Sequence, residues 1–238
     1  MSVYSSSSVH CETSIVWYHG ITQRYVTKRF HGRRLVGNWK ENVVRGEEPE
    51  GKTLGILGMG AVGKVYAPDA HATLTRKNLA TKAVALGMKI QYHNRVRLSP
   101  KDERAAGNAE YVPFETLLAT SDVLSLNLPL NLSTQHIISF SEFEKMKDGV
   151  VIVNTARGAV MDERALVEAL KSGKVRSAGL DVFEDEPRPH PGLLENENVL
   201  ILPHMGTHTR ETHKRMEVMV IENLRAAITE GRLLNPVN

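Results

Sequence analysis

The chain has a single cysteine, Cys11, among its 238 residues. One thiol cannot form an internal disulfide framework, so a disulfide-stabilised domain is excluded and a reducing compartment is indicated. Aromatic residues make up only 5% of the chain, no apolar stretch approaches the length of a membrane span, and no run of Lys and Arg interleaved with aromatics indicates a nucleic-acid-binding face. With 41% hydrophobic residues, 24% charged residues and a net charge of +3, the composition is that of an ordinary globular protein suited to small anionic ligands.

Acidic residues are almost missing from the beginning of the chain. Between the serine run at residues 5–8 and Lys40, the only acid is Glu12, against six Lys and Arg. A mitochondrial transit peptide has this balance. Because no sustained amphipathic period accompanies it, we interpret residues 1–36 as an irregular or disordered segment and expect a cytoplasmic protein, with a mitochondrial location as the alternative.

An apolar run that breaks into closely spaced glycines occupies residues 53–64. Gly58 would permit a tight turn after a strand, Gly60 would let the backbone approach a pyrophosphate, and Gly63 would let the next helix pack on the sheet. The N–H groups and the positive dipole end of that helix would face the phosphates. The pattern predicts a dinucleotide-binding unit, although alone it is equally compatible with a simple glycine-rich turn.

The second strand of this unit comes later than the fingerprint requires. An acid that holds the ribose normally follows about 20 residues on. The candidate strand at residues 88–95 instead places Asn94 31 residues after Gly63. Setting residues 65–77 aside restores the usual spacing and joins Lys64 to a helix-forming stretch at 78–87 that ends at Gly87. We therefore predict an insertion at residues 65–77, at the phosphate-binding helix.

Short apolar runs alternate with helical segments through the rest of the chain. Strands are predicted at residues 123–129, 149–154, 177–182 and 198–203, with a helix at 162–170 capped by Asp162 and a long amphipathic helix at 209–230. Doubly apolar strands separated by helices indicate a parallel sheet covered on both faces. The predicted fold class is α/β, a doubly wound parallel sheet of the Rossmann type with a C-terminal helix. We assign residues 37–208 to an NAD(P)-binding domain and 209–238 to the C-terminal helix and tail.

Candidate catalytic residues follow the predicted strands, where open parallel sheets bind ligands. They are Arg157, the acidic segment at residues 181–186, and His204. A guanidinium can bind a substrate carboxylate, an imidazole can transfer a proton, and a carboxylate can orient and charge the imidazole. Each residue alone is more often a surface ion-pair partner, a loop charge or a cap. Their shared position after strands of one sheet predicts an oxidoreductase site.

Four ordered motifs, at residues 55–60, 154–158, 180–187 and 203–206, together resemble the D-isomer-specific 2-hydroxyacid dehydrogenases. The resemblance runs from about Gly37 to the C-terminus apart from the insertion, and fungal glyoxylate/hydroxypyruvate reductases are the most similar in appearance. It implies that Arg157 binds substrate, that His204 is the acid/base and that Glu186 is its partner. It also implies cofactor contacts by the residues of the glycine motif and of the strand ends, namely Gly58, Gly60, Ala61, Val62, Gly63, Asn94, Arg95, Arg97, Leu128, Pro129, Thr134, Thr155, Ala156, Asp181 on the nicotinamide side, and Gly206.

The activity implied by the resemblance is NAD(P)-dependent reduction of a small 2-oxo acid, glyoxylate or hydroxypyruvate, to the D-2-hydroxy acid. Hydride would pass to C2 while protonated His204 delivers a proton to the carbonyl oxygen. Glu186 would favour the charged imidazole, and Arg157 would anchor the substrate carboxylate and polarise the carbonyl. The family usually forms homodimers, and no metal is implied.

Cofactor choice is indicated by Asn94, which stands where an acid is expected, and by Arg95 and Arg97. A carboxylate would repel a 2′-phosphate, whereas guanidinium groups can bind it bidentately. We therefore predict NADP(H) over NAD(H). The alternatives are that both arginines are solvated loop charges, or that the chain is an NAD-linked relative such as phosphoglycerate dehydrogenase.

Two departures from the family bear on activity. A substrate-binding lobe precedes the cofactor domain in the family, and residues 1–36 are too short to supply it, so an open cleft without full orientation or desolvation is expected. The insertion would displace the phosphate-binding turn, and we hypothesise that both departures are gene-model errors. A non-catalytic dinucleotide-binding module and an inactive fragment therefore stay open as alternatives. Poor solubility or an unusual oligomer would follow from an exposed apolar face on the last helix, formed by Met216, Met219, Val220 and Leu224.

Overall fold

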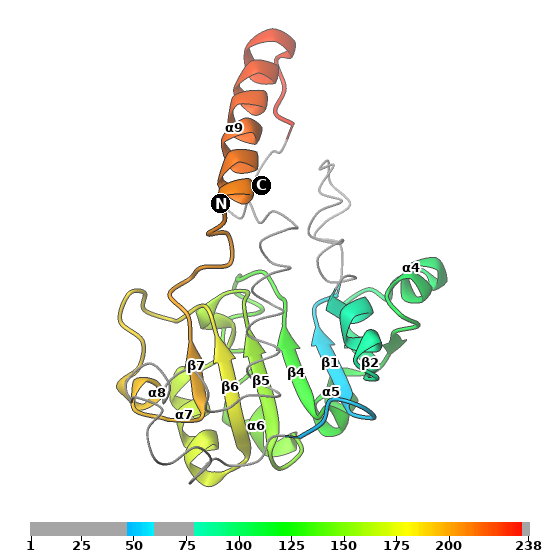
Figure 1. Cartoon of the computed structure of the whole chain (residues 1–238), viewed down its shortest axis with the longest axis vertical. Coiled ribbons are helices and arrows are strands. Elements are labelled where there is room, and N and C mark those ends of the chain that lie inside the picture. Colours follow the sequence, from blue (N-terminus) through cyan, green and yellow to red (C-terminus); the bar gives the residue numbers. More distant parts are fainter. Residues whose placement is uncertain (1–46, 60–78, 235–238) are drawn as a thin grey trace, which may run out of the picture.

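The computed structural model describes residues 47–59 and 79–234. Within these ranges the chain forms a seven-stranded sheet, in the order β3-β2-β1-β4-β5-β6-β7, in which all neighbouring strands are parallel (Figure 1). The strands are β1 (Thr53–Leu57), β2 (Lys89–His93), β3 (Glu110–Tyr111), β4 (Val123–Leu126), β5 (Val150–Asn154), β6 (Val175–Leu180) and β7 (Val199–Ile201). The predicted doubly wound α/β class is confirmed.

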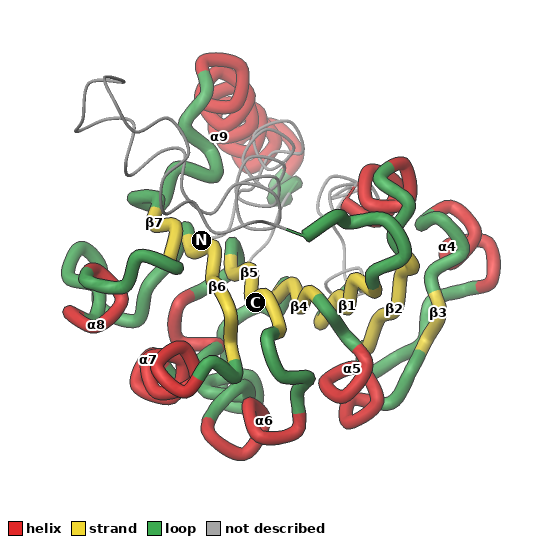
Figure 2. Tube along the Cα trace, turned by 60° about the horizontal axis from the view of Figure 1, so that its bottom comes forward, coloured by secondary structure: helices red, strands yellow, loops and turns green. Residues whose placement is uncertain are grey.

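Helices cover both faces of the sheet, and Figure 2 shows α5, α6 and α7 together on one of them. The helices are α4 (Pro100–Ala105), α5 (Phe114–Thr120), α6 (Phe140–Lys145), α7 (Glu163–Ser172), α8 (Pro191–Leu194) and α9 (Arg210–Glu230), with a 3-10 turn at η1 (Gly158–Val160). Residues 79–85 are also helical.

Alternate side chains of the central strands enter two separate hydrophobic clusters. Leu124 and Leu126 of β4 pack with α5, α6 and α7, whereas Val123 packs with residues 79–83 on the opposite face. Because side chains of a strand point alternately to its two faces, strands buried on both sides must be largely apolar, as β4 and β5 are apart from the buried Ser125 and Asn154. This explains why continuous apolar runs predicted the sheet.

Local signals set the helix ends, and the predicted cap at Asp162 and the predicted end at Gly87 are confirmed. Asp162 caps α7 by accepting the backbone N–H groups of Arg164 and Ala165, and α7 ends at Gly173 with φ of 81°. Thr209 caps α9 in the same way, through the N–H of Thr212. The helix that includes residues 79–85 is followed by Gly87, whose φ is 78°.

Some predicted boundaries were wrong. β4 ends at Leu126, three residues before Pro129, and β2 ends at His93. The two-residue β3 was not predicted, because a pair of residues carries no periodicity. Residues 60–78, with the predicted Gly60, Ala61, Val62, Gly63 and the insertion at 65–77, lie outside the described residues, as do residues 1–46.

From β1 the chain adds β2 and β3 on one side of the sheet, and it then returns to place β4 to β7 on the other side. β1 and β4, which are adjacent and parallel, therefore flank the point at which the strand order reverses. In open α/β sheets this switch point, outside the carboxyl ends of the strands, is where ligands bind. The carboxyl ends lie at the top of the sheet in Figure 1, on the side of α9.

The last helix, α9, extends away from the sheet (Figure 1). Val220 and Leu224 are exposed as predicted, together with Ile221 and Ile228, which are 65% and 75% exposed. Met216 and Met219, expected on the same face, are half-buried. None of the helices that the structure describes is long and apolar enough to cross a membrane.

Candidate active site

Gly58 forms a tight turn at the carboxyl end of β1. Its φ is 94°, and a Cβ at this position would lie 2.8 Å from Leu128 Cδ2 and 2.9 Å from the carbonyl oxygen of Asn127. Its N–H donates to the carbonyl oxygen of His93 at 3.0 Å, which ties the turn to the end of β2. Only glycine fits this conformation and this space. The first glycine of the fingerprint therefore sits at the switch point.

Asn94 follows β2 directly and is buried, with 7% of its surface exposed. Its Nδ2 has no hydrogen-bond partner among the described residues. A buried amide donor without a partner is costly, so such an atom marks a place where a polar ligand group would complete the bonding.

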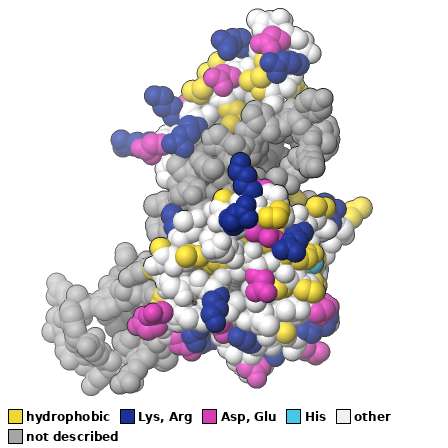
Figure 3. Space-filling model, turned by 90° about the vertical axis from the view of Figure 1, so that its right-hand side faces the viewer, with side chains coloured by type: hydrophobic (Ala, Val, Ile, Leu, Met, Phe, Trp, Pro, Cys, Tyr) yellow, Lys and Arg dark blue, Asp and Glu magenta, His cyan; other side chains and the backbone are white. Residues whose placement is uncertain are grey.

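The two predicted phosphate-binding arginines are in different situations. Arg97 makes a bidentate pair with Glu103, Nε to Oε1 at 2.7 Å and Nη2 to Oε2 at 3.1 Å. These bonds raise the pKa of Arg97 and hold the pKa of Glu103 below its usual range. Arg95 is exposed, and it makes no hydrogen bond or ion pair with another described residue. On the side of the molecule that carries α4, several Lys and Arg side chains lie at the upper end of the sheet region (Figure 3).

Buried Tyr92 anchors the Arg97–Glu103 pair to the sheet. Its hydroxyl donates to Glu103 Oε1 at 2.7 Å and accepts the N–H of Leu98 at 3.0 Å. Burial, and then the bond to Glu103, raise the pKa of Tyr92 to about 12. The Tyr92 hydroxyl thus fixes the segment after β2 at two points, the backbone of Leu98 and the side chain of Glu103.

Arg157 lies in a short loop after β5 that Asn154 closes. The buried Asn154 side chain donates from Nδ2 to the carbonyl oxygen of Arg157 and accepts the N–H of Ala156, both at 3.0 Å. The next residue is Gly158, where a Cβ would come within 1.9 Å of the carbonyl carbon of Phe183. The backbone after Arg157 therefore lies directly against the backbone that leads to Glu186.

His204 and Glu186 are brought together as predicted. His204 Nδ1 lies 2.7 Å from Glu186 Oε2, while Glu186 Oε1 accepts the N–H of Phe183 at 3.0 Å. The two side chains are 38% and 37% exposed, so the pair is reachable by a small molecule. His204 has φ of 52°, a left-handed conformation that is uncommon outside glycine and clusters at functional sites. A carboxylate at this distance orients the imidazole for proton transfer.

Asp181, at the end of β6, holds the loop after His204. Its oxygens accept the backbone N–H groups of Met205 at 2.7 Å and Gly206 at 2.9 Å, and the residue is 2% exposed. Burial raises the pKa of Asp181, and the two N–H donors oppose that shift. The predicted contact of Asp181 on the nicotinamide side stays a prediction, and its observed role is to fix the backbone beside His204.

The remaining predicted cofactor contacts lie at the same carboxyl edge. Thr134 is buried and its hydroxyl donates to the carbonyl oxygen of Pro129 at 2.6 Å, which closes the loop after β4. Leu128 packs against the core, and Thr155 and Ala156 are half-buried at the end of β5. Their contacts with a cofactor stay predictions.

Residues 24–206 match the family model of the D-isomer specific 2-hydroxyacid dehydrogenase, NAD binding domain. The chain belongs to this family of 2-hydroxyacid dehydrogenases. It is 56% identical over 201 residues to 4-methyl-2-oxopentanoate reductase A of Aspergillus oryzae, and 48% identical over 212 residues to glyoxylate reductase 1 of Saccharomyces cerevisiae, covering 84% and 86% of this chain. It spans about 56% of the length of each of these two relatives.

Two solved structures of similar fold support the assignment. A glyoxylate reductase from Paecilomyes thermophila superposes with a TM-score of 0.84 at 48% identity, and it matches 98% of this chain and 65% of that one. D-mandelate dehydrogenase of Rhodotorula graminis gives the same TM-score at 32% identity, over 98% and 66% of the two chains.

The matched model is that of the NAD-binding domain, so the cofactor that this domain binds is a nicotinamide dinucleotide. The described residues fit such a group. The Gly58 turn has no room for a side chain, as the tight turn after the first strand of a dinucleotide-binding unit requires, and the buried Asn94 amide at the end of β2 has no hydrogen-bond partner among the described residues.

Sequence reasoning missed several residues that hold the loops of the candidate site together. Asn154 was expected only as part of a motif. Neither the close backbone contact at Gly158 nor the bonds that Glu163 accepts from the N–H groups of Glu184 and His190 were foreseen. A glycine directly after Arg157 was the signal for a close backbone approach. Glu163 gave no comparable signal, since an acid in the first turn of a helix is ordinary.

Proposed function

We propose that the chain reduces a small 2-oxo acid, glyoxylate or hydroxypyruvate, to the D-2-hydroxy acid with a nicotinamide cofactor. The observation that carries this proposal is the 2.7 Å contact of His204 with Glu186 at the edge of the sheet where Arg157 and the Gly58 turn also lie. Relatives of the chain are named glyoxylate reductase, hydroxypyruvate reductase and 4-methyl-2-oxopentanoate reductase, which supports this substrate class.

Each side chain has a separate task in the proposed reaction. The bound nicotinamide would supply the hydride that reduces C2. Arg157 binds the substrate carboxylate through its planar, permanently charged guanidinium and directs the carbonyl toward His204. Because Glu186 contacts Nδ1, we assign the transferred proton to Nε2 of His204, which donates it to the carbonyl oxygen as C2 is reduced. Glu186 orients the ring and compensates the positive charge that the imidazole carries before transfer.

The experiment that tests this proposal is a turnover assay of the purified chain with NADPH and glyoxylate or hydroxypyruvate. We expect His204→Ala to lower kcat by roughly a hundred- to ten-thousandfold, the usual contribution of a general acid. NADPH affinity should stay unchanged. The matched control is His213→Ala, because His213 is an exposed histidine of α9. If the wild-type protein binds NADPH but turns over neither acid, the proposed enzymatic activity is refuted, and the alternative of a non-catalytic dinucleotide-binding module is supported.

We also propose that the cofactor is NADP(H) rather than NAD(H), with Arg95 as the main ligand of the 2′-phosphate. The exposed Arg95 guanidinium follows Asn94 directly, and no carboxylate stands at position 94 to repel the phosphate. Arg97 supports the site less directly, because two of its nitrogens already bind Glu103. Arg95→Ala should therefore weaken NADPH binding about tenfold or more while NADH binding is unchanged. Equal losses for both cofactors would contradict this assignment.

Two further proposals concern assembly and location. The resemblance to the family supports a homodimer, which sedimentation equilibrium would test. The single cysteine supports a reducing compartment, and we propose the cytoplasm.

A further inference from the structure

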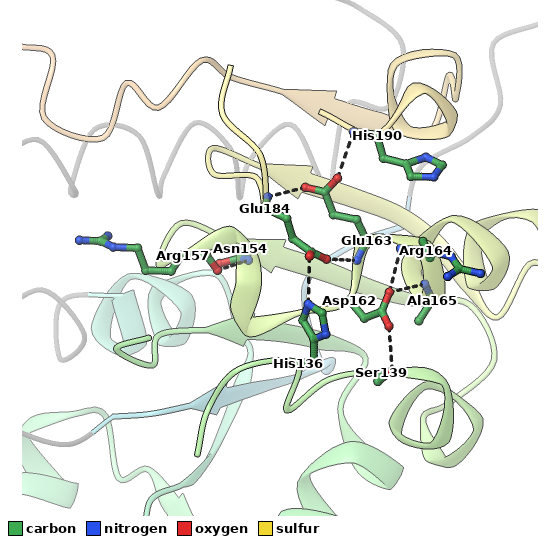
Figure 4. A network of polar contacts seen from close by, with 10 residues as sticks. All are labelled: His136, Ser139, Asn154, Arg157, Asp162, Glu163, Arg164, Ala165, Glu184 and His190. Carbon is green, nitrogen blue, oxygen red and sulfur yellow. Dashed lines mark hydrogen bonds and ion pairs between the residues drawn. The ribbon is translucent and has the colours of Figure 1, made fainter. Parts of the chain in front are cut away.

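The carboxylate of Glu163 holds the segment that carries Glu186 on both sides of that residue. Its Oε1 accepts the backbone N–H of Glu184 at 2.7 Å, and its Oε2 accepts the backbone N–H of His190 at 3.0 Å (Figure 4). Glu186 lies between these two points in the sequence. Glu163 is 7% exposed, so both bonds form where water competes little.

The side chain of Glu184 in turn binds the backbone of Glu163. Its Oε1 accepts the backbone N–H of Glu163 at 2.7 Å, and its Oε2 lies 2.9 Å from His136 Nε2. Each of the two glutamates is therefore bonded through its side chain to the backbone of the other, as Figure 4 shows. This reciprocal pair joins the start of α7 to the segment after β6.

Helix capping does not account for the position of Glu163. Asp162 is the N-cap of α7, and its Oδ1 accepts the N–H groups of Arg164 and Ala165. Both oxygens of Glu163 instead reach a different segment of the chain. A buried carboxylate needs such partners, and here the partners are the two ends of the loop that contains Glu186.

We propose that Glu163 is a positioning residue for the acid–base pair of Glu186 and His204. The inference rests on the proposed function and adds to it the group that sets the geometry of proton transfer. With both ends of segment 184–190 fixed, Glu186 keeps one oxygen on the N–H of Phe183 and the other 2.7 Å from His204 Nδ1. A charge-assisted bond of this length weakens steeply when the distance or angle changes, so loosening the segment would leave His204 poorly oriented.

Glu163→Gln tests the proposal, because an amide offers one acceptor oxygen and its NH2 group cannot accept the second N–H. The matched control is Glu168→Gln, a change of the same kind on an exposed part of α7, where Glu168 pairs with Lys171. Two quantities are measured on the full chain: the imidazole 1H and 15N NMR signals of His204, and kcat and KM for glyoxylate with NADPH. We expect the His204 signals to move toward those of Glu186→Gln, and kcat to fall roughly ten- to hundredfold with an unchanged Kd for NADPH.

The NMR readout needs no turnover, so it separates the two proposals. Wild-type protein without activity would refute the proposed function, whereas a folded Glu163→Gln protein with wild-type His204 signals would overturn the positioning role. An equal change of those signals in Glu168→Gln would also overturn it. If Glu163→Gln does not fold, Glu163→Asp, one methylene too short to reach both N–H groups, is measured in the same way. Failure of both variants to fold would assign Glu163 to folding and refute the proposal.

Discussion

Adding one methyl group at Gly158 should be among the most damaging small changes in this chain. An ideal Cβ at Gly158 would lie 1.9 Å from the carbonyl carbon of Phe183, 2.0 Å from its oxygen and 2.4 Å from the nitrogen of Glu184. Ordinary contact begins at 3.4 Å, so the two backbones must separate by about 1.5 Å. All three atoms belong to the backbone, which cannot yield as the end of a side chain would. Overpacking of a buried site costs about 1–3 kcal/mol, and we expect Gly158→Ala to cost about 3 kcal/mol or more.

Urea unfolding followed by circular dichroism measures this cost as a shift of the midpoint at constant slope. Gly173→Ala is the control, because a Cβ there meets nothing within 4 Å and only the left-handed conformation, with φ of 81°, is strained. That strain costs about 1 kcal/mol. The same separation would move Arg157 away from Glu186, so Gly158→Ala should also lose glyoxylate turnover. A stability loss no greater than that of Gly173→Ala would refute the argument from backbone contact.

Three further outcomes follow from the described contacts. Asp181→Ala leaves two buried N–H groups without their acceptor and should cost about 2–4 kcal/mol in urea unfolding, whereas Asp185→Ala, at an exposed position, should change stability by less than about 0.5 kcal/mol. The folded chain holds the Tyr92 proton more tightly than an unfolded chain, whose tyrosine titrates near 10, so stability should fall as the pH rises from 10 to the folded pKa of about 12, and Tyr92→Phe should remove that loss. Leu224→Lys should reduce concentration-dependent self-association in sedimentation velocity if the exposed apolar face of α9 drives it, and unchanged sedimentation would contradict this.

The sequence predicted the sheet well because burial on both faces leaves few polar positions in the central strands, Ser125 in β4 and Asn154 in β5. β4 and β5 are buried at every residue, so their apolar runs could not be confused with half-exposed strands. The contact between Glu186 and His204 was predictable for a topological reason: each residue follows a strand, and parallel strands end at one edge of the sheet. β3 was missed since its pairing with β2 depends on two residues only.

Contacts between distant side chains and backbone were beyond sequence reasoning. Arg97 was predicted to bind phosphate together with Arg95, but the sequence gives no sign that Glu103 would hold it, because the bend that brings α4 back to β2 depends on the tertiary fold. The resemblance to the family implied that Asp181, which follows β6, contacts the nicotinamide side, and this contact stays a prediction. The hydrogen-bond donors to Asp181 in the structure, the N–H groups of Met205 and Gly206, follow the next strand, and no spacing rule reveals them.

The same kind of contact occurs at three loops of the candidate site, those that carry Arg157, Glu186 and His204. A buried polar side chain at the end of a strand or the start of a helix binds the backbone of a loop of the site. Asn154 binds the loop that it begins, beside Arg157, whereas Glu163 and Asp181 accept N–H groups of more distant segments, around Glu186 and after His204. The anchors are buried, whereas the proposed catalytic side chains are partly exposed. Buried side chains therefore fix the backbone, while partly exposed side chains on that fixed backbone are left to meet solvent and substrate. It follows that replacing His204 should affect turnover with little loss of stability, while replacing Asp181 should affect both.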